Sequence, residues 1–513
     1  TVLSRGLGDV YKRQATNNAI SITPESEIKQ FVGEYDVAVC GYGGAGGCAS
    51  LEASRNNAKV ILFERASDGG GSTALSSCEM YLGGSGGTSL QNACGFEDSN
   101  ENMIAYIEAS LEGKGDSKKI RLYCENAASH FEWVKSLGVN YKESAHLGRI
   151  VVPESNESLL YTGNERVSPF SDYAKPVPRG HVPSHEGDFG GKIFFDALKE
   201  TIKKTKNISV SFDSRVLGLV VNEQNVIVGV SFKKDNIVQH IKVTKGVILT
   251  AGGFVMNEEM INKYLPFQTS FGAPYGNPWD KGDGIQIGLL MNANVINMDE
   301  AFFGVYFYPP ESLTYGIFVN SDGKRFVNED SYGARIGYYC SQQKGQKAYM
   351  VIQNEDFEPS IYIDKLPILA VAETIEELEI EAGFKEGSIS STIRTYNSDA
   401  RNGKDEQFNK ASQWLKEISK PPFAIIDYSF SNQASPAYSD KTGPLMFTLG
   451  GLETLPTGEV LNKDGEVIPK LYAAGRTTAG LPRTGKGYAS GMSVGDATFF
   501  GRMAGISAAQ NNN

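Results

Sequence analysis

The first regular pattern of hydrophobic residues along the chain predicts a strand–helix–strand unit. The apolar run YDVAVC at 35–40 is typical of a buried strand. The small-residue segment GCASLEASRNNA at 47–58 predicts a helix, and KVILFE at 59–64 predicts a second strand that ends in a carboxylate. Units of this kind build parallel sheets covered by helices, so the pattern indicates an α/β fold.

The pattern changes twice further along the chain. Short apolar runs alternate with polar residues between 203 and 250, which predicts a β-meander that returns to the first sheet. From about 297 the chain becomes aromatic and Pro-containing, as in EAFFGVYFYPPESLTYG at 300–316. A capping box at 374–377, TIEE, then opens a predicted helix that stops at Gly383.

These changes predict the domain organisation. We expect a first domain formed by 34–296 and 433–513, with a second domain, 297–432, inserted into it. We expect 1–33 to be non-structural, because TVLSRGLGDVYKRQ at 1–14 resembles translated adapter sequence and the following residues are typical of a polar linker.

Composition narrows the class of protein. A chain of 513 residues is too long to form one simple hydrophobic core, so two or three domains are expected. A net charge of −11 argues against a nucleic-acid partner. Without an apolar run of roughly 18 to 20 residues, we expect no membrane span and a cytoplasmic location.

Metal sites are not expected. The six Cys show no CxxC spacing, which argues against a zinc ribbon, a cysteine-ligated iron–sulfur cluster or a disulfide scaffold. His181 and His185 are four residues apart, but Pro and Gly around them argue against the helix that would bring both to one metal.

The glycine-rich turn GYGGAG at 41–46 predicts a dinucleotide site. Gly41 permits the tight turn, Gly43 lets the backbone approach a pyrophosphate, and Gly46 lets the helix pack close to the sheet. Gly44 and Ala45 complete the turn, and the helix N-terminus faces the phosphates. Glu64, 18 residues beyond Gly46, is placed to accept a hydrogen bond from a ribose hydroxyl.

The segment after Glu64 favours FAD over NAD. RASDGGGSTALS at 65–76 is a loop of glycines and hydroxyls, whereas an NAD domain would proceed to its next helix. The candidate contacts in this loop are Arg65, Gly71, Ser72, Thr73 and Ser76. No second GxGxxG follows a strand, so we expect electrons to pass through an external donor or acceptor.

In this loop and in five later segments the chain resembles the fumarate reductase/succinate dehydrogenase flavoprotein superfamily. The segments are GVILTAGGF (246–254), KGDGIQIGLLMNA (281–293), NSDGKRFVNE (320–329), LYAAG (471–475) and GRMAG (501–505). The resemblance implies a Rossmann-like FAD-binding domain formed by 34–296 and 433–513, with an α+β capping domain, 297–432, inserted for the substrate. It also implies non-covalent FAD, because no His stands at the position used for covalent attachment. With the start of the last predicted helix, it adds these candidate flavin contacts: Ala251, Gly252, Gly253, Asp283, Gly475, Ser493 and Val494.

Three segments resemble the 3-ketosteroid Δ4-(5α)-dehydrogenases of that superfamily: STALS (72–76), YLGG (81–84) and YASG (488–491). Ser77-Cys78 departs from the Gly-Gly usual in those enzymes. The resemblance implies a hydrophobic, steroid-like 3-keto substrate. It also implies that Tyr488 exchanges the proton next to the ketone, with Tyr332 as its hydrogen-bonding partner. Ser490 and the Gly491 N–H would then polarise the keto oxygen.

Two alternatives remain open. Phe447 stands where fumarate reductases carry a His, and the position of their proton-donating Arg falls at or beside Gly333. Both differences argue against a reductase for an unsaturated acid, but Arg335 and Arg483 leave this alternative open. A non-catalytic flavin electron-relay subunit is the other alternative. Five aromatic residues either line a flat apolar pocket or form an ordinary hairpin core: Phe302, Phe303, Tyr306, Phe307 and Tyr308.

Overall fold

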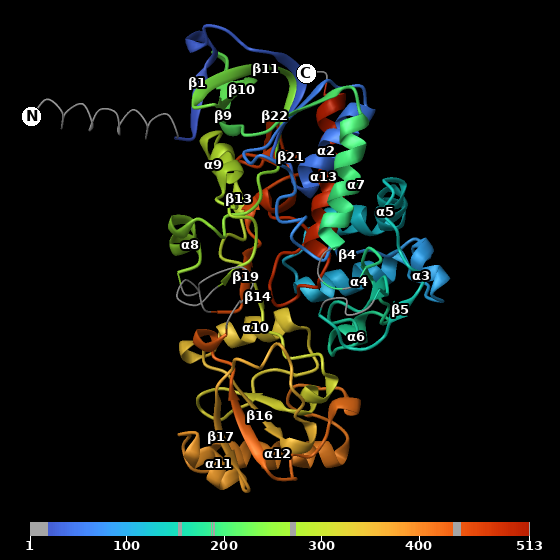
Figure 1. The fold of residues 1–513 in the computed structure, drawn as a ribbon, viewed down its shortest axis with the longest axis vertical. Helices are drawn as coiled ribbons and strands as arrows, with labels where there is room; N and C mark the ends of the chain where they lie inside the picture. Colours follow the sequence, from blue (N-terminus) through green and yellow to red (C-terminus); the bar gives the residue numbers. More distant parts are fainter. Residues whose placement is uncertain are drawn as a thin grey trace, which may run out of the picture.

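The largest unit of the fold is a nine-stranded sheet. A computed structural model describes residues 19–151, 156–185, 187, 190–266, 273–433 and 443–511. The strands of this sheet are β1 (Ser21–Pro24), β2 (Glu34–Cys40), β3 (Val60–Phe63), β8 (Ile208–Ser211), β9 (Arg215–Val221), β10 (Ile227–Lys234), β11 (Ile237–Leu249), β21 (Glu459–Leu461) and β22 (Val467–Ala473). Seven follow the order β1-β9-β10-β11-β2-β3-β8, while β22 pairs with β11 and β21 with β22 (Figure 1).

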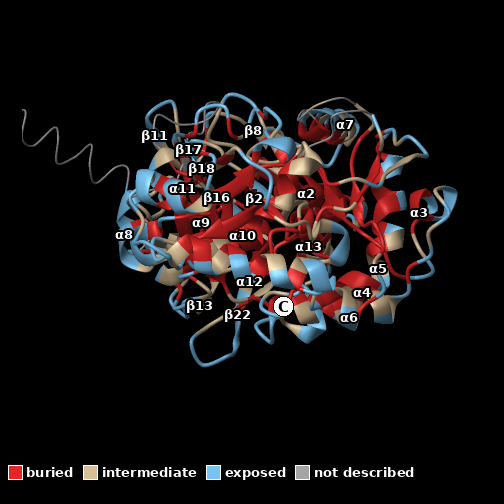
Figure 2. Ribbon diagram, turned by 90° about the horizontal axis from the view of Figure 1, so that it is seen from below, coloured by how far each residue is buried: buried red, intermediate tan, exposed pale blue. Residues whose placement is uncertain are grey.

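The predicted strand–helix–strand unit is confirmed. β2 and β3 pair in parallel, and α2 (Gly44–Arg55) connects them. The last helix, α13 (Met492–Gln510), packs against α2, and both are buried at the centre of the molecule (Figure 2). A Cβ at Gly505 would lie 2.2 Å from the Ala49 oxygen, so the two helices meet backbone to backbone. The fold class is the predicted α/β one, with helices packed on a sheet that is partly parallel.

The predicted meander is also confirmed. The prediction that residues 1–33 are non-structural is wrong in part. β9, β10 and β11 pair antiparallel in chain order. β1, however, pairs in parallel with β9, so residues 21–24 belong to the sheet. An edge strand is held by the hydrogen bonds of its backbone, so a polar pattern of side chains does not reveal it. The part of the expected linker at 1–18 lies outside the described residues.

A second body contains the four-stranded sheet β15-β16-β18-β17. Its elements are β15 (Ile317–Val319), α10 (Gly333–Ser341), β16 (Tyr349–Gln353), β17 (Ile368–Ala372), α11 (Ile375–Glu381), α12 (Ser388–Asn402) and β18 (Phe423–Asp427). It forms the lower part of the molecule in Figure 1. As predicted, Thr374 caps α11 by accepting a hydrogen bond from the Glu377 N–H. The boundaries at 297 and 432 stay a prediction.

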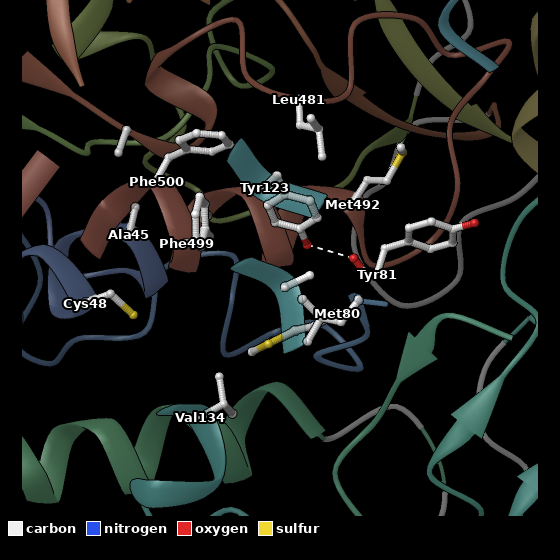
Figure 3. Packing of buried hydrophobic residues seen from close by; sticks show 14 of the residues in the cluster. Ala45, Cys48, Met80, Tyr81, Tyr123, Val134, Leu481, Met492, Phe499 and Phe500 are labelled. Carbon is white, nitrogen blue, oxygen red and sulfur yellow. Dashed lines mark hydrogen bonds between the residues drawn. The ribbon is translucent and has the colours of Figure 1, made fainter. Parts of the chain in front are cut away.

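A small sheet contacts α13 through β4. It has the order β4-β7-β6-β5, and a separate three-stranded sheet has the order β12-β19-β14. The bounds are β4 (Met80–Tyr81), β5 (Ala145–His146), β6 (Leu159–Leu160), β7 (Gly180–His181), β12 (Ala273–Pro274), β14 (Ala301–Gly304) and β19 (Leu445–Thr448). α5 (Ser117–Ser136) backs the small sheet, and its Tyr123 hydroxyl donates to the Tyr81 oxygen at 2.8 Å (Figure 3).

The remaining elements are shorter or peripheral. They are α3 (Ser89–Ala93), α4 (Asn100–Leu111), α6 (Phe170–Tyr173), α7 (Gly190–Lys204), α8 (Glu258–Tyr264), α9 (Asp283–Leu290), β13 (Val295–Ile296) and β20 (Gly451–Leu452), with several 3-10 turns between them. Within the described ranges, none of the helices has both the length and the apolar character needed to span a bilayer.

Candidate active site

One cavity of about 510 Å³ opens at the carboxyl ends of β2, β3 and β11. Ligands of open α/β sheets bind at this edge. Of the residues predicted to contact the cofactor and of the four assigned to the proton and the keto oxygen, all except Gly46 and Gly253 line this cavity, so the cofactor candidates and the tyrosines share one space. A Cβ at Gly253 would instead lie 2.6 Å from the Thr448 hydroxyl.

The glycine-rich turn has the geometry expected for a pyrophosphate site. A Cβ at Gly43 would meet no protein atom closer than 3.9 Å, so the space beside this backbone belongs to the cavity. Gly41 has φ of +114°, in the region that favours glycine. A Cβ at Gly46 would lie 1.8 Å from the Gly41 oxygen, which explains why this glycine packs the helix and does not line the cavity.

Glu64 directly follows β3 and points back to the turn. Its carboxylate accepts hydrogen bonds from the Tyr42 and Ala66 N–H groups, both at 2.9 Å. Burial raises the pKa of Glu64, although these hydrogen bonds oppose the shift. The residue also lines the cavity, so its carboxylate is held at a fixed position on the cavity wall, and its contact with a ribose hydroxyl stays a prediction.

Asp283 is less directly available to a cofactor than the sequence suggested. Its carboxylate pairs with Arg65 at 3.2 Å and with Arg215 at 2.9 Å. The Arg65 guanidinium also lies 4.1 Å from the centre of the Trp279 ring. Asp283 therefore orients Arg65 at the cavity wall. Arg215 and Trp279 were missed because they carry no motif in the sequence.

The hydroxyl loop is tied to residues that are far away in the chain. The Thr73 hydroxyl accepts a hydrogen bond from the Gly44 N–H at 3.2 Å. The Ser72 hydroxyl donates to Asp280 at 2.9 Å and accepts from Arg476 at 2.6 Å. Arg476 also forms an ion pair with Asp280. Sequence analysis missed both members of this pair.

The residues present fit FAD. The turn presents backbone next to open space, a buried carboxylate follows the second strand, and neither α2 nor α13 has a side-chain cap at its N-terminus. Because neither N-cap residue supplies a side-chain acceptor, the first-turn N–H groups and the helix dipole favour anionic groups at both helix N-termini. Ser493 and Val494, in the first turn of α13, line the cavity as predicted.

Aromatic side chains from distant segments cluster on one part of the cavity wall, around Phe302, Phe447 and Tyr488, which we call the aromatic end. The Phe302 and Phe447 rings stack with 4.4 Å between centroids and an angle of 10°. Tyr488 meets both rings edge-on, at 5.0 and 5.5 Å. Its hydroxyl donates to the Ser493 hydroxyl at 3.0 Å, and burial raises the pKa of Tyr488 to about 12. The phenol is therefore neutral at physiological pH.

The expected hydrogen bond between Tyr332 and Tyr488 is wrong. The Tyr332 hydroxyl lies 3.2 Å from that of Tyr306 instead, and Tyr488 is paired with Ser493. Burial raises the pKa of both Tyr306 and Tyr332 well above the usual value. The cavity thus contains two separate hydroxyl pairs, because contacts across a cavity depend on how distant segments meet.

Ser490 and Gly491 connect this end to α13. Gly491, with φ of +90°, is the N-terminal cap of α13, so the predicted start of that helix is confirmed. Of the five uncertain aromatic residues, Phe302 and Tyr306 line the cavity. Phe303, Phe307 and Tyr308 belong to a hydrophobic core around β14 and β15.

Arg335 and Arg483, the two arginines that left a reductase for an unsaturated acid open, do not lie at the cavity. Neither Arg335 nor Arg483 is among the described residues that line the cavity. The Arg335 guanidinium stacks 5.0 Å from the centre of the Phe170 ring. Arg483 donates to the Gly480 oxygen at 2.9 Å. His181, of the histidine pair, contacts the Thr88 hydroxyl at 2.7 Å and the Arg179 oxygen at 2.8 Å.

Comparison with known proteins identifies the family of this chain. A family model described as an FAD binding domain matches residues 36–491. The structure of 3-ketosteroid-Δ4-(5α)-dehydrogenase from Rhodococcus jostii RHA1, in complex with 4-androstene-3,17-dione, is 36% identical, with a TM-score of 0.88, over 96% of this chain and 100% of that chain. A probable fumarate reductase of Shewanella frigidimarina is 28% identical over 92% of this chain and 74% of its own length. The 3-oxo-5-alpha-steroid 4-dehydrogenase of Comamonas testosteroni is 24% identical over 86% and 92%. The chain therefore belongs to the FAD-binding family of the fumarate reductase/succinate dehydrogenase flavoproteins and is an FAD-dependent oxidoreductase.

Proposed function

We propose that the protein adds or removes hydrogen across the C4–C5 bond of a 3-keto steroid or a bile-acid-like relative. The observation that carries this proposal is the aromatic end of the cavity, where Tyr488 packs on the stacked rings of Phe302 and Phe447, while Ser490 lines the same cavity. Three arginines are among the described lining residues: Arg65, Arg215 and Arg476. Each is ion-paired with an aspartate, so a substrate dicarboxylate would have to compete with an existing partner.

Bound FAD would exchange a hydride with the substrate carbon, and the side chains of the cavity would handle the proton. Tyr488 gives that proton to the carbon next to the ketone in the reductive direction and removes it in the oxidative direction. Its pKa of about 12 makes it a weaker acid than free tyrosine but keeps the phenol protonated at neutral pH, which is the form that reduction requires. The Ser493 hydroxyl, at 3.0 Å, accepts a hydrogen bond from the neutral phenol, and by turning its own O–H toward that oxygen it would stabilise the phenolate that remains.

The negative charge that develops on the keto oxygen needs hydrogen-bond donors. Ser490 and the Gly491 N–H supply them in this proposal, since both residues line the cavity at the start of α13. Tyr306 and Tyr332, whose hydroxyls lie 3.2 Å apart, line the same cavity and are further hydroxyl groups near the substrate in this proposal. An external donor or acceptor would exchange electrons with the flavin.

A reductase for an unsaturated acid is the second candidate. Arg476 favours it, because its guanidinium lies 5.6 Å from the centre of the Phe447 ring, at the aromatic end of the cavity. The similarity to a probable fumarate reductase points the same way.

Anaerobic reoxidation of the reduced flavin by a panel of substrates tests both candidates. We expect steroid enones to reoxidise it faster than fumarate or urocanate. Faster reoxidation by the acids would favour the second candidate. Steady turnover with a reduced dye separates either enzyme from a flavin electron-relay subunit.

A further inference from the structure

The two segments that carry the proposed chemistry come from different parts of the chain. Tyr332 directly precedes α10, whereas Ser490 lies just before α13. A short segment after β6, residues 162–164, contacts both, and we call it the bracket segment. Neither Thr162 nor Asn164 is among the described residues that line the cavity.

Thr162 holds Ser490 through two hydrogen bonds. The Ser490 N–H donates to the Thr162 oxygen at 2.8 Å. The Thr162 hydroxyl donates to the Ser490 oxygen at 3.0 Å. Because the bonds engage both polar groups of the Ser490 backbone, they fix its orientation and therefore the direction of its Cα–Cβ bond. Thr162 is buried, which excludes water as a competing partner.

Gly163 brings the bracket segment close to the segment around Tyr488. A Cβ at Gly163 would lie 2.6 Å from the Ala489 Cβ and 2.6 Å from the Tyr106 hydroxyl. Both contacts are shorter than packed atoms allow, so this close approach requires glycine. The distance between the bracket segment and Ala489 is therefore fixed by backbone contact.

Asn164 holds the other half of the site. Its side-chain oxygen accepts a hydrogen bond from the Tyr332 N–H at 2.8 Å. The Asn164 N–H in turn donates to the Tyr106 hydroxyl at 2.9 Å. Asn164 is fully buried, so this link is also shielded from water. Two residues apart in the sequence, Thr162 and Asn164 thus hold two segments that lie more than 150 residues apart.

We propose that the bracket segment sets the position of Ser490 relative to Tyr332, with Thr162 and Asn164 as positioning residues for the reaction. This inference rests on the roles proposed above for Ser490 and Tyr332. Reaction rates depend steeply on such positions, and a misplacement of about 1 Å can cost about 100-fold. Loss of either side-chain link should therefore lower the rate of the chemical step more than it lowers substrate binding.

Thr162→Val tests the first link because valine keeps the shape and removes the hydroxyl. We expect retained FAD and a steroid-enone Kd within about threefold of the parent, since apolar contacts supply most of that binding. Single-turnover flavin reoxidation should slow by about 10- to 100-fold. Thr162→Ser restores the hydroxyl and should return the rate to within about threefold. Asn164→Ala should give a comparable loss.

Thr392→Val is the matched control. The Thr392 hydroxyl also donates to a backbone oxygen of a distant segment, that of Gly323, at 2.6 Å, but far from the cavity in the second body. We expect this variant to keep the parent rate. A Thr162→Val rate within threefold of the parent, or a loss equal to that of Thr392→Val, would overturn the inference.

Amide hydrogen exchange tests the bracket segment without turnover. The Ser490 and Tyr332 N–H groups should be protected in the FAD-loaded parent. Asn164→Ala removes the acceptor of the Tyr332 N–H and should speed exchange there. Thr162→Val keeps the backbone acceptor of the Ser490 N–H and loses only the hydroxyl link, so it should speed exchange at Ser490 by a smaller factor. Rapid exchange at both amides in the parent would refute the bracket segment even if a variant fails to fold. A parent inert toward every enone would instead count against the proposed function and leave the exchange test decisive.

Discussion

Tyr488→Phe is the sharpest test of the proposed chemistry. Phenylalanine preserves the edge-on contacts with Phe302 and Phe447, at 5.0 and 5.5 Å, and removes only the hydroxyl. The lost partner is Ser493, at 3.0 Å. One neutral hydrogen bond contributes about 0.5–1.5 kcal/mol to stability, so the variant should fold and retain FAD.

The effect on the rate should be larger than that hydrogen bond explains. General acid or base catalysis by a placed side chain contributes about 10²- to 10⁴-fold. This corresponds to a barrier increase of about 3 to 5.5 kcal/mol. Substrate binding should change less than the rate, because the ring system of a steroid binds mainly through apolar contact.

Single-turnover reoxidation of reduced flavin by a steroid enone measures this effect. Tyr396→Phe is a matched control, because Tyr396 is a buried tyrosine of α12 whose hydroxyl contacts Lys410 at 3.4 Å, away from the cavity. We expect the control to keep the parent rate. A Tyr488→Phe rate within about threefold of the parent would remove Tyr488 from the mechanism.

Three further predictions concern the cofactor site and the proton. Gly43→Leu should yield mostly apoprotein, because its side chain would enter the space left open beside the turn; full FAD content after purification would show that this turn does not hold the pyrophosphate. Glu64→Ala should weaken FAD binding by about 10- to 150-fold, equivalent to about 1.5–3 kcal/mol for a charge-assisted hydrogen bond, and unchanged retention on dilution would contradict its role. Because burial raises the pKa of Tyr488 to about 12, its phenol stays protonated from pH 7 to about 10, and the rate of enone reduction should stay level there. A fall in that rate centred near pH 8 would contradict Tyr488 as the acid.

The local features of this protein were predictable from the sequence. The βαβ unit, the meander and the helix after Thr374 depend on periodicity and capping within a few residues. The position of Glu64 was predictable for the same reason, because Glu64 lies at the end of a predicted strand. The positions of Tyr488 and Ser490 near the start of α13 followed from family resemblance at one short segment.

Only the tertiary structure decided which distant groups meet. Tyr306 pairs with Tyr332, and Arg476 joins Ser72 and Asp280, yet none of these contacts leaves a periodic trace in the sequence. The links from Thr162 to Ser490 and from Asn164 to Tyr332 are of the same kind. Spacing along the chain constrains residues within one element, because backbone geometry repeats there. Contacts between elements depend on how the sheets and helices pack, which the pattern of any single segment does not contain.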